Sequence, residues 1–204
     1  MPDFVFSKKT GNYRYKASGH AVPPERISGW IERAAEQMER DLARHAEDLR
    51  AGRINDAEWA LRSTEAIKNG HRAVAVIAGG GKANMAASDW GFLGATIRRE
   101  LSYFNRFANE VEARPEGAQL ADAFVSRAKS YGAAIYSTFE QQQRRRVLKD
   151  GTHAFERNIL EGGRQHCDGC LRETSRGKVG VGELIPVGER DCGTRCRCRI
   201  EYSN

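Results

Sequence analysis

The chain has 204 residues, 40% hydrophobic and 29% charged, with a formal net charge of +6 at pH 7, which suits one medium-sized domain with or without a small appendage. The positive charge fits an anionic partner such as nucleic acid, although solvated helical proteins often carry a similar excess. The longest apolar run, AVAVIA at residues 73–78, and the polar N-terminus predict neither a membrane-spanning segment nor a secretory signal peptide, so we expect no membrane partner and reduced cysteines.

Residues 1–22 are predicted to form an N-terminal arm. Basic and aromatic residues alternate in it, most clearly in the stretch NYRYKAS at residues 12–18. This alternation is compatible with a short strand, with an extended segment that docks on a partner, or with contact to nucleic acid. A loosely held terminus is the simplest alternative.

Residues 23–150 carry the pattern of four long helices, over residues 23–52, 55–79, 88–115 and about 115–146. Prolines begin the first helix and a glycine ends it. Its apolar stripe, spaced by three and four residues, consists of Ile31, Ala35, Met38, Leu42, His45 and Leu49. Four such helices with mostly short connections predict a mainly α fold, an antiparallel helical bundle.

Residues 151–204 differ in composition, because glycine becomes frequent and long apolar stripes disappear. We predict a small α+β module here, with a short helix over residues 153–160. The best strand candidates are VGVGELIPVG at residues 179–188 and CRIEY at residues 198–202.

Two motifs in the helical region have a structural interpretation beside a functional one. The stretch VIAGGGKANM at residues 76–85 lacks the spacing and the Ser or Thr of a phosphate-binding loop, so a flexible glycine linker is the better explanation. The basic cluster at the end of the fourth helix can complement the helix dipole, or it can contact phosphate or an acidic partner. This cluster consists of Arg144, Arg145, Arg146 and Lys149.

The cysteines carry the strongest functional signal. All five lie in the last forty residues, as a C-x2-C pair followed after a loop by a C-x3-C-x-C cluster. Such short-spaced thiols on either side of a loop are typical of a tetrahedral zinc site. The predicted ligands are Cys167, Cys170, Cys192 and Cys196, with Cys198 able to replace one of the last two and His166 as a further candidate.

A thiol-rich ligand set indicates structural rather than catalytic zinc, because catalytic sites keep an open position and usually include histidine or carboxylate ligands. The module has too few large apolar residues to fold by burial alone, so a metal ion explains how it holds together. Arg195, Arg197 and Arg199 are expected to offset the thiolate charge. A disulfide between the two cysteine groups remains the alternative. No catalytic motif accompanies the cysteines, and we expect no enzyme.

The motifs HCDGC, GELIPVGERDC and CRCRIEY together resemble the C-terminal signature of phage head morphogenesis proteins, the Mu F-like minor head protein family. The helical segments LSYFNRFANEV and RAKSYGAAIYSTFE agree with it in style. Two departures stand out. Many relatives place a histidine before the final C-R-C where this chain has Cys192, and some carry an additional enzymatic or toxin-like domain that this chain lacks.

The resemblance implies a minor structural protein of a tailed-phage head, inside the virion near the portal vertex after assembly in the host cytoplasm. Its expected partners are the portal protein, other capsid proteins and packaged double-stranded DNA. The rival interpretation is a zinc-ribbon regulator of the nucleic-acid-binding class, in which the C-terminal arginines contact phosphates.

Overall fold

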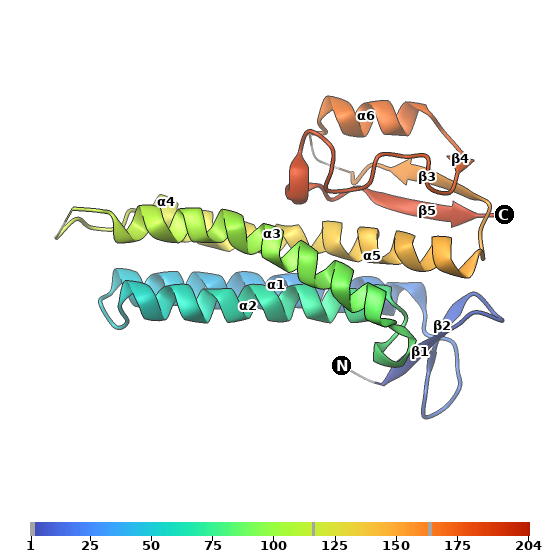
Figure 1. Cartoon of the computed structure of the whole chain (residues 1–204), viewed down its shortest axis with the longest axis horizontal. Helices are drawn as coiled ribbons and strands as arrows, with labels where there is room; N and C mark the ends of the chain where they lie inside the picture. Colours follow the sequence, from blue (N-terminus) through green and yellow to red (C-terminus); the bar gives the residue numbers. More distant parts are fainter. Residues whose placement is uncertain (1–2, 116, 163–164) are drawn as a thin grey trace.

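The computed structural model describes residues 3–115, 117–162 and 165–204, and it is mostly helical with a small C-terminal sheet and a cysteine cluster. Figure 1 shows the long helices lying alongside one another, with the C-terminal module on one side of them and the N-terminal hairpin at one end. No helix among these residues is both long and apolar enough to cross a membrane.

The first two helices of the core are α1 (Pro24–Arg50) and α2 (Asp56–Ala78). Every residue of the apolar stripe predicted for the first helix is buried. Asn55 caps α2 by accepting a hydrogen bond from the Glu58 N–H at 2.9 Å, which satisfies one of the free donors at a helix start. The predicted helix boundaries here are therefore confirmed to within a few residues.

Helix α3 (Ala87–Glu112) packs against α2 and contributes Phe104 and Phe107 to an aromatic cluster around the fully buried Trp59. Phe124 joins the same cluster from the next helix. Aromatic rings at these separations bury large apolar areas and interlock in specific orientations. The cluster therefore fixes α3 and the following helix against α2.

The predicted fourth helix is wrong in its continuity and its start. The chain forms α4 (Asp122–Ser130), a 3₁₀ turn η2 (Tyr131–Ala133) and α5 (Ala134–Asp150). Gly132 lies inside the turn and is the weakest helix former in this stretch. Residues 117–121 form no helix. The apolar spacing continues through the break, so periodicity gave no sign that the helix is interrupted.

The N-terminal residues form a hairpin of β1 (Phe4–Ser7) and β2 (Asn12–Tyr15), so the strand alternative applies. The hairpin packs on the helical body: Phe4 and Phe6 are buried, and the Tyr13 hydroxyl donates to the Ile77 carbonyl at 2.9 Å.

The stretch Gly79–Gly81 is not a flexible linker. The Phe6 N–H donates to the Gly80 carbonyl at 2.7 Å, and a short 3₁₀ turn, η1 (Lys82–Asn84), follows.

The C-terminal module contains β3 (Phe155–Ile159), α6 (Asp168–Ser175), β4 (Val179–Gly180), the 3₁₀ turn η3 (Gly193–Arg195) and β5 (Arg199–Ser203). The strands form one antiparallel sheet in the order β4-β3-β5. The helix predicted over residues 153–160 is wrong. Glu156 and Asn158 are buried while their neighbours are exposed, so polar residues at the inward positions hid a strand pattern.

Three polar side chains of α5 attach the module to the helices. Gln141 donates to the Val187 carbonyl at 2.7 Å, Arg144 donates to the Leu184 carbonyl at 2.7 Å, and Glu140 accepts the Ile200 N–H at 2.9 Å. All three side chains are buried. These three residues of α5 are therefore the points at which the C-terminal module docks on the helices.

Candidate metal centre

The two cysteine groups meet in the C-terminal module. Cys167 is the N-cap of α6 and Cys170 lies in its first turn, so the C-x2-C pair occupies the start of one short helix. Cys192 precedes η3 and Cys196 follows it directly, while Cys198 immediately precedes β5. Helix start, 3₁₀ turn and strand entry thus present their sulfurs to one small volume.

The sulfur positions form two overlapping triads. Ligand atoms of Cys167, Cys170 and Cys192 lie within 4.8 Å of one another, as do those of Cys170, Cys196 and Cys198. The Cys170 Sγ belongs to both triads and lies 3.6 Å from the Cys192 Sγ and 3.5 Å from the Cys196 Sγ. Cys170 is therefore the centre of the cluster.

These separations fit a shared metal ion. With a metal–sulfur distance of about 2.3 Å, two ligands of a tetrahedral zinc site lie about 3.8 Å apart. The observed separations of 3.5 Å and 3.6 Å are too long for a disulfide, whose sulfurs are about 2.05 Å apart. All five cysteines are free thiols. The C-terminal cysteines are close enough to hold a metal ion.

The pKa values of the clustered thiols are shifted in opposite directions. A hydrogen bond from the Cys198 thiol lowers the pKa of Cys196 to about 5, and the same interaction raises the pKa of Cys198. Burial, together with bonds to neighbouring thiols, raises the pKa of Cys192. Without a cation, therefore, ionisation of Cys196 is favoured at the expense of Cys192 and Cys198. A divalent ion supplies the positive charge that lets several thiols ionise together.

The start of α6 is held against the second cysteine group. The Gly169 N–H donates to the Asp191 carboxylate at 2.7 Å. A Cβ added to Gly169 would lie 3.0 Å from Asp191 Oδ2 and 3.3 Å from Arg190 Cβ. The glycine of C-x2-C thus suits the close approach of the loop before Cys192, where a larger residue would have to displace the Asp191 and Arg190 side chains.

Arg190 is a positive group in contact with the cluster, and the sequence patterns did not single it out. Its Nη1 lies 3.9 Å from the Cys170 Sγ and donates to Asn158 Oδ1 at 2.7 Å, while its Nε donates to the Ile185 carbonyl at 2.9 Å. The side chain is buried. A buried guanidinium among thiolates reduces their mutual repulsion. Its position two residues before Cys192 is the only sequence signal for this role.

The arginines expected to offset the cluster make other contacts. The Arg197 guanidinium lies 4.6 Å from the centre of the Tyr136 ring and pairs with Glu39 at 3.6 Å. Arg199 pairs with Glu201 at 3.3 Å. Arg195 is exposed on η3. Cys196 and Cys198 are buried while Arg195 and Arg199 are exposed, so the predicted alternation holds for these residues. Arg195 and Arg197 also line the small cavity that the five cysteines share, whereas Arg199 does not.

His166 lies at the edge of the cluster, with its Nδ1 4.0 Å from the Cys198 Sγ. That distance is too long for a direct hydrogen bond of ordinary strength. A metal-bound Cys198 would bring this ring next to the ion, whereas a site built on the other four cysteines leaves His166 outside it. The histidine therefore distinguishes the two ligand sets.

The basic cluster predicted to contact phosphate or a partner is divided by the fold. Arg144 pairs with Glu156, and the Arg146 guanidinium lies 3.7 Å from the centre of the Phe6 ring. Both arginines are buried, which favours the structural alternative for them. Arg145 and Lys149 are partly exposed and lie 3.9 Å and 3.4 Å from Asp89.

No protein-family model, curated protein or solved structure matches the chain in the comparisons. The fold and the site define a mostly helical protein with a C-terminal module built around a cysteine cluster that is close enough to hold a metal ion.

Proposed function

We propose that the protein is a minor head protein of a phage, a structural component that associates with the portal vertex inside the capsid. The supporting observation is the convergence of the cysteines from HCDGC and CRCRIEY on Cys170, in a module packed on α5. The head-morphogenesis signature consists of these same motifs. In this proposal the helical body is an antiparallel bundle and serves as an assembly element, without catalytic activity.

The metal in the proposal is one structural zinc ion per chain. Zinc accepts four thiolates in tetrahedral geometry, and its sites of this type close completely around the ion. The ligands proposed first are Cys167, Cys170, Cys192 and Cys196. The charge of about −2 left by four thiolates and one divalent ion is reduced by Arg190, whose guanidinium is 3.9 Å from the Cys170 Sγ.

Co-expression with the portal protein from the same genome cluster tests the assembly role. We expect the chain to co-purify with portal rings after nuclease treatment, and to be found in mature particles at low copy number. A zinc-free or misassembled module should abolish the association, so the zinc content of the bait is measured in the same preparation. Zinc-loaded protein that ignores the portal protein contradicts the proposal. Tight, sequence-specific binding to promoter DNA would instead support the zinc-ribbon regulator.

A further inference from the structure

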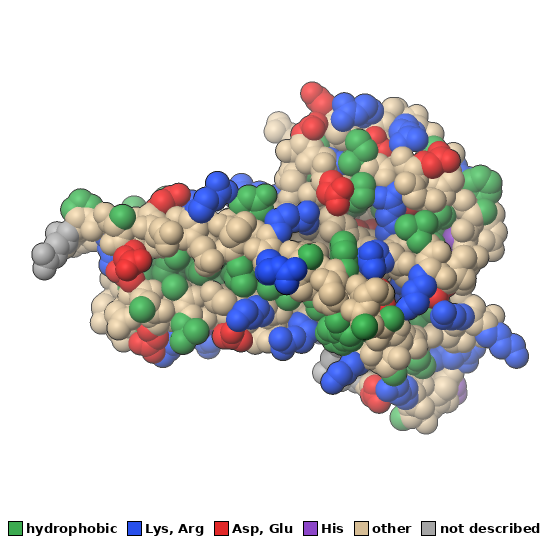
Figure 2. Space-filling model, viewed as in Figure 1, with side chains coloured by type: hydrophobic (Ala, Val, Ile, Leu, Met, Phe, Trp, Pro, Cys, Tyr) green, Lys and Arg blue, Asp and Glu red, His purple; other side chains and the backbone are tan. Residues whose placement is uncertain are grey.

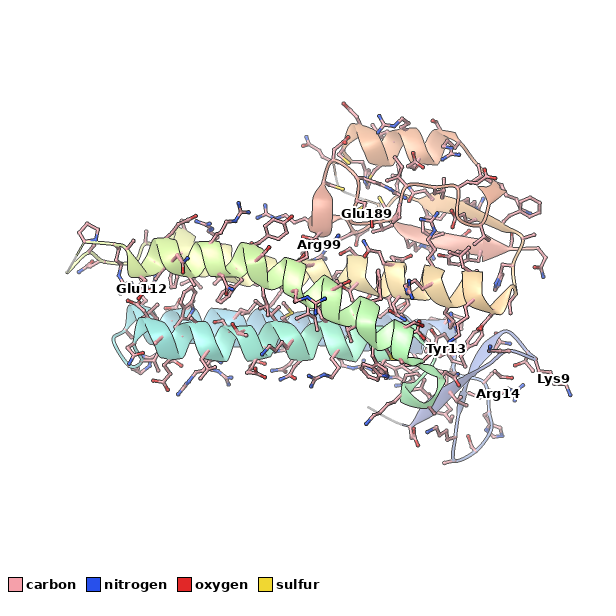
Figure 3. All side chains as sticks on the ribbon, in the orientation of Figure 1. Lys9, Tyr13, Arg14, Arg99, Glu112 and Glu189 are labelled. Atoms are coloured by element: carbon pink, nitrogen blue, oxygen red, sulfur yellow. The ribbon has the colours of Figure 1, made fainter. Side chains whose placement is uncertain are left out.

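A cationic cleft lies between the helices and the C-terminal module, away from the basic cluster that the sequence presents. Its volume is about 640 Å³. Four arginines line it, two from α3, one from α4 and one from η3: Arg99, Arg106, Arg127 and Arg195. Figure 2 shows Lys and Arg side chains gathered along α3 beside the module, and Figure 3 labels Arg99 on α3 just below it.

The cleft keeps a positive excess. Its four arginines exceed its two carboxylates, Glu100 and Glu110, by two charges. Glu110 pairs with Arg127. Glu100 is buried, and burial raises the pKa of its carboxyl group, so it neutralises less of the cleft than an exposed carboxylate. Among the described residues, Arg99, Arg106 and Arg195 form no salt bridge.

The lining also offers aromatic faces. Tyr103 is 43% exposed and carries Arg106 over its ring at 5.2 Å, whereas the half-buried Tyr131 packs against Phe104 and Phe107 and presents only part of its ring. Guanidinium groups recognise phosphate through paired N–H donors, and exposed aromatic rings stack with bases. An acidic peptide would use the charges but not the rings. This combination therefore favours nucleic acid over an acidic protein segment.

We propose that this cleft binds the phosphodiester backbone of a nucleic acid strand, with Arg106 and Arg195 contacting phosphates from opposite walls. The wall from η3 includes Cys192 and Thr194, so the cysteine cluster positions one side of the cleft. The proposal goes beyond the portal association and does not depend on it, because the portal experiment is performed after nuclease treatment. Either one can fail without the other.

Fluorescence anisotropy with a labelled single-stranded DNA of about 15 nucleotides, and with the same sequence as a duplex, tests the proposal. Between about 50 and 200 mM salt, the affinity should fall steeply, because each phosphate contact releases counterions. Arg106→Gln and Arg195→Gln should each weaken binding roughly fivefold to tenfold and lower the slope of log K against log salt by about 1. A preference for the single strand or for the duplex identifies the physiological form.

Arg98→Gln is the matched control, since Arg98 is an exposed arginine of α3 next to Arg99 but outside the cleft. It should leave affinity and salt slope unchanged, and circular dichroism should show all three variants folded. The proposal is overturned if Arg98→Gln weakens binding as much as the cleft variants. It is also overturned if neither DNA binds, or if a polyglutamate peptide binds through Arg106 and Arg195 while DNA does not.

Discussion

The Arg144 guanidinium donates to Glu156 across 2.9 Å, and this buried ion pair joins α5 to β3. Glu156 Oε1 also accepts the Leu184 N–H at 2.9 Å, and Arg144 donates to the Leu184 carbonyl at 2.7 Å. Glu156 has no exposed side-chain surface. Arg144, Glu156 and the Leu184 backbone therefore form one hydrogen-bonded network where the module meets the helices.

Replacing Arg144 with glutamine should destabilise the protein strongly. The substitution leaves the Glu156 charge buried without its partner, and breaking such a pair typically costs about 3–5 kcal/mol. The free energy of unfolding in urea measures the loss. Arg40→Gln is the control, because its ion pair with Glu36 is exposed on both sides (60% and 62%), and exposed pairs contribute about 0–1 kcal/mol. Equal losses for both variants would mean that the buried pair has no special role.

Cys170→Ser should abolish metal binding, because the Cys170 Sγ belongs to both sulfur triads. Elemental analysis should find about one zinc per chain in the unmodified protein and almost none in this variant. Hydrogen exchange should rise across β3 and β5, whereas α1 and α2 should keep their protection because their core is separate.

Cys198→Ser is the informative comparison for the ligand set. The proposed first ligands exclude Cys198, so this variant should retain zinc. If it loses zinc as fully as Cys170→Ser, the ion is held by the triad of Cys170, Cys196 and Cys198, and His166 becomes the candidate for the fourth ligand. Zinc retained by Cys170→Ser would contradict both ligand sets.

Gly81→Ala should detach the N-terminal hairpin. Gly81 has a φ of +101°, and an added Cβ would lie 2.5 Å from the Phe4 carbonyl oxygen. Strained backbone and overpacking together predict a loss of about 2–4 kcal/mol. Gly52→Ala separates the two effects, because Gly52 has a φ of +68° with nothing within 4 Å of the added atom, and should cost about 1 kcal/mol. Chemical denaturation measures the loss, and the solvent exposure of Trp30, whose ring packs at a tilt against that of Phe4, reports the detachment. Similar losses in the two variants would show that the hairpin contact contributes nothing.

His71 should make stability fall with acid. Burial lowers the pKa of His71 to about 4 from its usual 6.5, and its Nδ1 lies 2.7 Å from Thr138 Oγ1. As the pH falls from 6.5 to 4, the unfolded chain therefore binds a proton at His71 that the folded protein does not bind. Stability is fully present above this window and decreases through it, by up to about 3 kcal/mol.

Denaturation of the wild type and His71→Gln at several pH values checks this, because the loss of metal in acid is common to both proteins and cancels in their difference. The variant should have a flatter profile between pH 6.5 and pH 4. His20→Gln is the control, since His20 is exposed. Parallel profiles for the wild type and His71→Gln would assign the acid sensitivity to other groups.

The sequence determined the first three long helices, because their apolar stripes match the helical period and their caps and glycines mark the ends. Leu42 and Ile67 are fully buried as those stripes require. It also identified the cysteines as a group, since short spacings on both sides of a loop limit where the sulfurs can lie. The strand over residues 155–159 was missed because Glu156 and Asn158 occupy its inward positions.

Only the tertiary structure decided which charged side chains are exposed and can contact a partner. Arg144 and Arg146 form the densest basic stretch of the sequence, yet packing buries them against Glu156 and Phe6. Arg106 and Arg195 are far apart in the chain but line one cleft. A side chain's charge is written in the sequence, whereas its exposure depends on which elements pack around it, and that is set by contacts between segments that no local pattern records.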